Sequence, residues 1–62
     1  MAEMKMFRFE GDLYRMEMDG IRIVGEPEIE AGDGKWVKVP FDDGFAAMMY
    51  GMPVREDKGE WW

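Results

Sequence analysis

Hydrophobic and polar residues alternate with a period of two over the first 25 residues of the chain. Because successive side chains of a β-strand point to opposite faces of a sheet, this period predicts strands. Glycine-containing turn signals interrupt the pattern twice, so we expect a three-stranded antiparallel meander. The expected strands are Met4 to Glu10, Leu13 to Met18 and Ile21 to Gly25.

Two dipeptides set the expected register of this meander. Asp19-Gly20 is a pair that type I′ turns favour, and Gly11-Asp12 is taken as a second two-residue turn. Both registers bury the same face, and this agreement between independent turns favours the assignment. The expected buried face holds Phe7, Phe9, Tyr14, Met16, Met18, Ile21 and Ile23. The expected opposite face holds Met4, Met6, Arg8, Leu13, Arg15, Glu17, Arg22 and Val24.

The rest of the chain adds short strands and one helical segment. Residues 28–39 predict a hairpin around Asp33, which has a glycine on each side. The stretch "DDGFAAMMYG" predicts a short helical turn near residues 43–50, with Asp42 or Asp43 as N-cap and Gly51 after its last turn. We therefore expect an all-β, mainly antiparallel domain over residues 1–62, shaped as a small SH3-like or OB-like barrel of five to six short strands.

The last residues, "EDKGEWW", also have the pattern of a hairpin. Asp57-Lys58 would form the turn, Gly59 would be the left-handed residue of a G1 bulge, and Val54 would lie opposite Trp61. Trp61 is then expected to join the core, as a chain this short needs. Trp62 would point to the other side of the strand, where it is expected either to cover part of the fold or to anchor a partner.

Composition argues against catalysis. The 62 residues include no Cys, His, Ser, Thr, Asn or Gln. The chain therefore lacks an imidazole base, a thiol or aliphatic hydroxyl nucleophile, and the ligands of a structural zinc. We expect no enzyme activity, no cofactor and no metal. No apolar run is long enough to span a membrane, so a cytoplasmic protein without a membrane partner is expected.

Acidic residues concentrate in the second part of the chain. The net charge is −6: residues 1–25 have four basic and five acidic groups, and residues 26–62 have four basic and nine acidic groups. This imbalance disfavours nucleic acid and favours a basic partner surface. A row of acids can equally protect a sheet edge from aggregation. The carboxylates that would meet a partner are Glu26, Glu28, Glu30, Asp33, Asp42 and Asp43.

Two further groups of side chains are candidate contacts. Met48 and Met49 cannot both point inward from one helix, so we expect one of them to be exposed beside Tyr50 as part of an adaptable apolar surface. Three arginines of the meander form the other group. They are interpreted either as a solvated, ion-paired face or as a platform for phosphate groups. These arginines are Arg8, Arg15 and Arg22, of which Arg8 and Arg15 are expected to lie directly opposite each other.

Three hypotheses of function remain. The first is a small acidic inhibitor or adaptor that docks on a basic surface of a larger protein. Such a surface can also be one that binds nucleic acid. Small virus-encoded proteins that disable host enzymes, including nuclease inhibitors that imitate DNA, share this general character. The alternative is an accessory subunit or a self-associating SH3-like domain, because short chains gain stability by association. Nucleic-acid binding through the three arginines is a third, weaker hypothesis.

Overall fold

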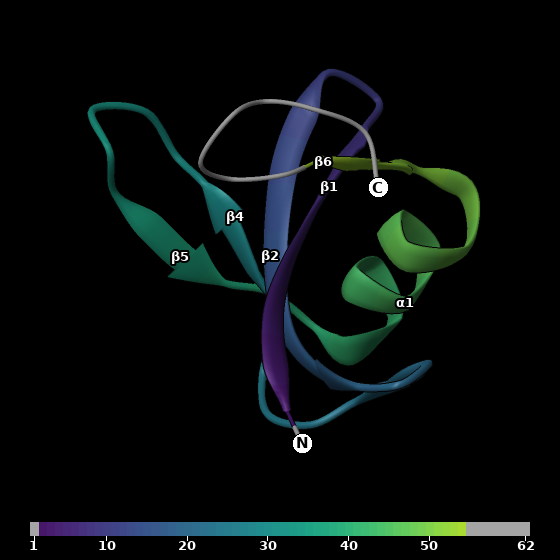
Figure 1. Ribbon diagram of the computed structural model, residues 1–62. Helices are drawn as coiled ribbons and strands as arrows, with labels where there is room; N and C mark the ends of the chain where they lie inside the picture. Colours follow the sequence, from purple (N-terminus) through teal and green to yellow (C-terminus); the bar gives the residue numbers. More distant parts are fainter. Residues whose placement is uncertain (1, 55–62) are drawn as a thin grey trace.

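The computed structural model describes residues 2–54 of the chain (Figure 1). Within these residues, six strands form one sheet and a single helix packs against it. Every strand pairing is antiparallel, which confirms the predicted all-β class with one short helix. The elements are β1 (Glu3–Phe9), β2 (Asp12–Asp19), β3 (Arg22–Ile23), β4 (Glu28–Glu30), β5 (Trp36–Lys38), α1 (Phe41–Tyr50) and β6 (Met52–Val54).

The long β1–β2 hairpin is the centre of the sheet. The strands follow the order β5-β4-β2-β1-β6, and β3 pairs with β2 beside β4. Figure 1 shows the β4–β5 hairpin extending from one side of this pair, whereas α1 lies on the other side. Among residues 2–54, β5 and β6 do not pair, so the sheet stays open there. The predicted barrel therefore stays a prediction.

The β1–β2 turn lies one residue earlier than predicted. Glu10 and Gly11 occupy it with φ angles of 54° and 82°, the two positive values that a type I′ turn needs. This position also puts glycine second in the turn, where type I′ favours it most. Phe7 consequently pairs with Tyr14, whereas the predicted Gly11-Asp12 turn would pair it with Met16. A shift of two residues leaves each side chain on its predicted face.

The β2–β3 turn is displaced in the opposite direction. Met18 pairs with Ile23, so Gly20 and Ile21 form the turn in place of Asp19-Gly20. Gly20 has a φ of 66°, a conformation that costs glycine little. The prediction that Ile21 is buried is wrong, because this side chain is 89% exposed at the turn. Ile23 packs against the core instead.

The core lies between the sheet and α1. Its fully buried members come from β1, β2 and the inner side of the helix, and a ring of partly buried side chains surrounds them. Met16 is 1% exposed and is one of the largest completely buried side chains. The buried cluster is Phe7, Met16, Met18 and Ala47, packed against Phe9, Tyr14, Ile23 and Met48.

Helix α1 begins at Phe41, directly after Pro40, and not at an aspartate cap. The predicted N-cap role of Asp42 or Asp43 is wrong, because no side chain caps this end and both aspartates lie inside the first turn. Negative charge in the first turn still stabilises the helix through its dipole. At the other end, Gly51 donates its N–H to the carbonyl of Ala47 at 2.8 Å, and its backbone is extended.

Gly44 brings the helix close to the chain that leads into β4. Pro27 is completely buried against it, and a Cβ atom at position 44 would overlap the Cβ and Cγ atoms of the Pro27 ring. The Met16 side chain would lie 3.7 Å from the same added atom. The absence of a side chain at Gly44 therefore sets the distance between α1 and the sheet.

The predictions for the chain end lie outside the described residues. They concern the Asp57-Lys58 turn, Gly59, and the two tryptophans Trp61 and Trp62. For residues 2–54, no helix has the length and apolar character needed to cross a membrane.

Candidate protein-binding surface

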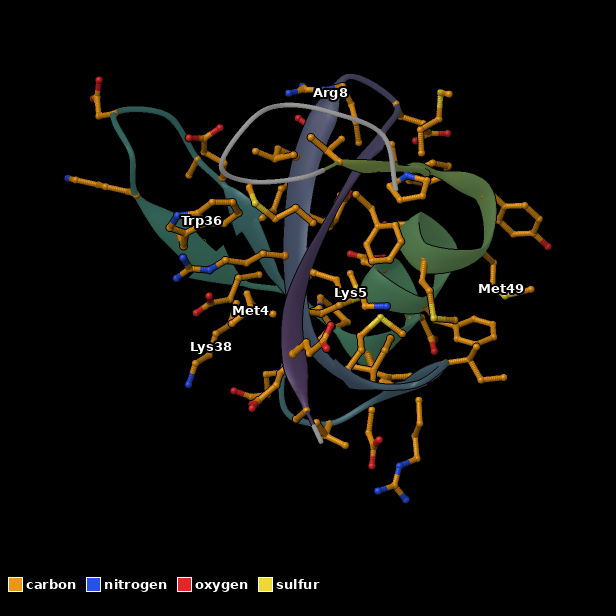
Figure 2. The ribbon with its side chains drawn as sticks, viewed as in Figure 1. Met4, Lys5, Arg8, Trp36, Lys38 and Met49 are labelled. Carbon is orange, nitrogen blue, oxygen red and sulfur yellow. The ribbon has the colours of Figure 1, made fainter. Side chains whose placement is uncertain are left out.

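An apolar stripe runs along the outer side of α1. Phe41, Phe45 and Met49, spaced four residues apart, are 53%, 44% and 55% exposed, and we call these three residues the helix stripe. Residues four apart lie on the same side of a helix, which explains why they form one line. The Phe41 and Phe45 rings stack with centroids 6.0 Å apart and an angle of 22° between their planes. Figure 2 shows Met49 pointing away from the sheet.

Of the two adjacent methionines of α1, one is exposed and the other is not, as predicted. Met49 is exposed in the helix stripe, whereas Met48 packs against the core and leaves the candidate surface. Tyr50 ends the helix with 77% of its surface exposed, and Met52 follows in β6 with 57% exposed. Met52 pairs with Arg8, whose neighbour Phe7 faces the core, so Met52 lies on the face of the sheet opposite α1 and does not extend the helix stripe.

Carboxylates lie at the N-terminal end of the helix stripe. Asp42 and Asp43 are exposed in the same helical turn as Phe41. Asp43 also lies close enough to Tyr14 of β2 to act on it: burial raises the pKa of Tyr14, and the charges of Asp12, Asp43 and Glu10 raise it further. The first turn of α1 therefore faces the middle of β2 near Tyr14.

The acids of β4 are on the other face of the sheet. Glu28 pairs with Arg15 across the strands and Glu30 pairs with Trp36, so both glutamates share the face opposite α1. Glu28 accepts a hydrogen bond from Arg15 Nε at 2.6 Å. The Arg15 guanidinium carbon lies 4.2 Å from the centroid of the Trp36 ring, a cation–π distance. Glu28 is therefore neutralised inside the fold.

The remaining predicted acids are exposed but separate. Lys38 Nζ forms an ion pair with Glu26 Oε1 at 3.0 Å, and the hydrogen bond to Glu26 raises the pKa of Lys38. Asp33 sits at the tip of the β4–β5 hairpin with a φ of 54°. The predicted acidic row is thus divided between the two sides of the sheet, and only Asp42 and Asp43 adjoin the exposed apolar stripe.

The three arginines lie on their predicted face of the sheet, but Arg8 and Arg15 are not directly opposite each other, and the platform stays a prediction. Arg8 pairs with Leu13, so it lies diagonal to Arg15 and the expected like-charge pair does not form. Arg15 is bound to Glu28 and stacked on Trp36. Arg22 stands opposite Asp19 in the short β3 pairing. One of the three guanidinium groups is therefore engaged within the fold.

The Arg15–Glu28 pair is expected to contribute only a little to stability. Its side chains are 33% and 22% exposed, so the pair still reaches solvent, and pairs in contact with solvent contribute about 0.2–1 kcal/mol. In a double-mutant cycle of Arg15→Met and Glu28→Gln, each of which removes the charge and keeps the length of the side chain, we expect a coupling energy within this range, measured by urea unfolding. The exposed Lys38–Glu26 pair is the matched control. A coupling energy above about 2 kcal/mol, twice the expected maximum, would show that the pair behaves as a buried ion pair.

Phe41 is the main surface residue that the sequence interpretation missed. The helix was expected to start at an aspartate cap, which leaves Phe41 outside it. Its spacing of four from Phe45 and eight from Met49 was the available signal, because that spacing repeats on one side of a helix.

Other classes of site find no support in residues 2–54. This part of the chain encloses no pocket and holds no group of three or more side chains suited to a metal ion. Comparisons of the whole chain with protein-family models, with curated proteins and with solved structures give no match.

Proposed function

We propose that this chain is a small protein-binding module, an inhibitor or adaptor, that inserts the helix stripe into an apolar groove of a larger protein. The observation that carries the proposal is the exposed, stacked pair Phe41 and Phe45, continued by Met49. Amphipathic helices that dock in grooves use apolar anchors with this spacing. A flexible methionine at the end of the stripe suits a groove of irregular shape.

The charges of the surface select the kind of groove. Asp42 and Asp43 flank the stripe, and the chain as a whole carries a net charge of −6. Opposite charge on the rim of the groove would speed association and fix the orientation of the helix. The proposed partner is therefore a protein whose apolar groove has lysines and arginines on its rim, such as a surface that also binds nucleic acid.

The proposed complex includes further contacts outside the helix stripe. Glu30, Asp33 and Trp62 are secondary contacts, because the partner can extend beyond the helix. A barrel of the SH3-like or OB-like kind would complete the fold, and the cytoplasm is the proposed location. Self-association through the same stripe is the alternative, and it predicts a different experimental result.

Capture of partners from cell lysate, with the full chain as bait, tests the proposal. A protein that is retained by wild type should be lost with Phe45→Ala, and titration of the purified partner should show affinity weakened about tenfold or more, or about 1.4 kcal/mol. Val37→Ala, which truncates a side chain 51% exposed on β5, should leave the affinity unchanged. Equal binding by wild type and Phe45→Ala would refute the role of the stripe.

Charge is tested separately in the same titration. Asp42→Asn with Asp43→Asn should slow association at low salt and have less effect at high salt, because salt screens exposed charges. Glu3→Gln with Glu17→Gln, which removes two charges from exposed positions outside the proposed surface, is the matched control. Sedimentation across a concentration series distinguishes the alternative: a dimer that Phe45→Ala abolishes, with no partner captured, would indicate self-association.

A further inference from the structure

Strand β5 ends the sheet on the side away from β6. Within residues 2–54, no strand pairs with its outer edge. Figure 1 shows β5 as the outer arm of the β4–β5 hairpin, which extends from the β1–β2 pair. The backbone N–H and C=O groups along an edge strand are a template for pairing with a further strand. This edge is therefore a candidate interaction surface, separate from the helix stripe.

The alternation of backbone groups along β5 identifies the residues that face outward. In an antiparallel ladder, residues whose N–H and C=O groups point to the neighbouring strand alternate with residues whose groups point away from it. Lys35 accepts one backbone hydrogen bond from the β4 arm of the hairpin at 2.8 Å, and Val39 donates one to it at 3.0 Å. Val37, midway between them, therefore also faces β4. The N–H and C=O groups of Trp36 and Lys38 consequently point away from the sheet.

Among antiparallel registers, one allows two copies of this edge to pair completely. It sets Trp36 opposite Lys38 of the second copy, and Lys38 opposite Trp36 of the second copy, so every outward N–H and C=O group of these residues gains a partner. A register that sets Lys38 opposite Lys38 opposes like charges and brings in Pro40, which has no N–H to donate. A register that sets Trp36 opposite Trp36 extends to Gly34, which has a φ of 74° in the hairpin turn and is not extended.

The side chains are complementary in the same register. Val37, which is 51% exposed, would lie opposite Val37 of the second copy on the side of the sheet that packs against α1. On the other side, the Lys38 ammonium group would lie next to the Trp36 ring of the second copy, and an indole ring attracts a cation. Lysine on an edge strand usually hinders pairing, but here it opposes an aromatic ring and no other cation. No two opposed residues of the paired strands therefore carry like charge.

We infer that the outer edge of β5 pairs with the same edge of a second copy, as an antiparallel, two-fold symmetric dimer centred on Val37. A second copy is favoured over another protein because the edge is complementary to itself, as a two-fold interface requires. The strands are three residues long, so the interface is smaller than the about 1,000 Å² of a stable complex, and the dimer is weak and reversible. Closure of the sheet into a barrel would use the same edge and is the competing arrangement.

The pairing would also set the relative direction of two helices. Opposed residues of antiparallel strands share a face, so both copies of α1 would lie on the same side of the joined sheet. The dimer would thus present two helix stripes in one direction, and a partner with two grooves would be bound by avidity. This consequence rests on the proposed function, whereas the pairing of β5 does not.

Disulfide trapping in the full chain tests this register. The chain contains no cysteine, so Val37→Cys gives one thiol per copy. The two positions 37 would form a non-hydrogen-bonded pair with Cα atoms about 4.5 Å apart, and a disulfide joins Cα atoms about 4.4–6.8 Å apart. Met49→Cys and Met4→Cys are matched controls, because the side chains at 37, 49 and 4 are 51%, 55% and 49% exposed. Under mild air oxidation, Val37→Cys should form the covalent dimer about tenfold faster or more than either control, since pairing raises the effective concentration of the two thiols.

Further substitutions in the Val37→Cys chain test the backbone pairing. Lys38→Pro removes an outward N–H group that makes no hydrogen bond to β4, so the rate of dimer formation should fall to that of the controls. Lys38→Ala keeps this N–H group and should retain most of the rate. Phe45→Ala should leave the rate unchanged, which separates the result from the proposed function. Circular dichroism verifies that each variant is folded.

Three results would overturn the inference. Equal rates of dimer formation with cysteine at positions 37, 49 and 4 would indicate random collision. The fastest rate at position 49 would assign self-association to the helix stripe. A rate at position 37 below that of both controls would show that another part of the same chain covers the edge of β5.

Discussion

Replacing Met16 by alanine is expected to remove most of the stability of this domain. The side chain is 1% exposed and lies between the sheet and α1, beside Gly44. Truncation of a buried methionine costs about 2–5 kcal/mol, since apolar contacts are lost and a cavity remains. A chain of 62 residues has about 3–9 kcal/mol in total. Urea unfolding followed by circular dichroism should show a much lower midpoint or no folded baseline.

Met49→Ala is the matched control for this experiment, because it deletes the same atoms from a side chain that is 55% exposed. Its cost is expected to stay within about 0.5 kcal/mol, as for most surface substitutions. Equal losses in the two variants would mean that the face packed against α1 is not the main core of the protein.

Replacing Gly44 by alanine should destabilise the domain, against the usual trend for helices. In an exposed helix interior, alanine is about 1 kcal/mol more favourable than glycine. Here the new methyl group would overlap the ring of Pro27, which is completely buried and has no rotamer to escape into. Overpacking of this kind costs about 1–3 kcal/mol, so the sign of the effect reverses. Thermal unfolding gives the sign directly.

A double-mutant cycle separates the clash from other effects of the substitution. Pro27→Gly removes both ring atoms that the added methyl group would meet. Gly44→Ala should therefore be neutral or stabilising in the Pro27→Gly background, even though Pro27→Gly alone lowers stability. The same cost of Gly44→Ala in both backgrounds would show that contact with Pro27 is not its cause.

The faces of the meander could be predicted from the sequence, but its turns could not. Both turns were placed one residue from their true positions, which moves each pairing by two residues and preserves the face of almost every side chain. Several glycine-containing dipeptides can form such turns with small differences in energy. Packing decides among these turns. The register that packs Ile23 against the core places Ile21 in the exposed turn.

The candidate surface was predicted only in part for a related reason. Local spacing correctly placed Glu28 and Glu30 on one side of a strand, and it identified Met49 or Met48 as exposed. Whether an acid is free to meet a partner depends on contacts between distant parts of the chain. The pairing of β2 with β4, which brings Arg15 to Glu28, has no signature in the residues around either one.

The pairing of β6 with β1 has a consequence for how the protein opens and folds. Met6 meets Val54 from near the other end of the described chain, whereas the β1–β2 hairpin forms from neighbouring residues. Contacts of such sequence separation carry the greater loop-closure entropy, so β6 and the attached α1 are expected to dock after the β1–β2 hairpin has formed. A partner that binds the helix stripe would thus also keep α1 and β6 docked on the sheet and slow the exchange of their amide hydrogens.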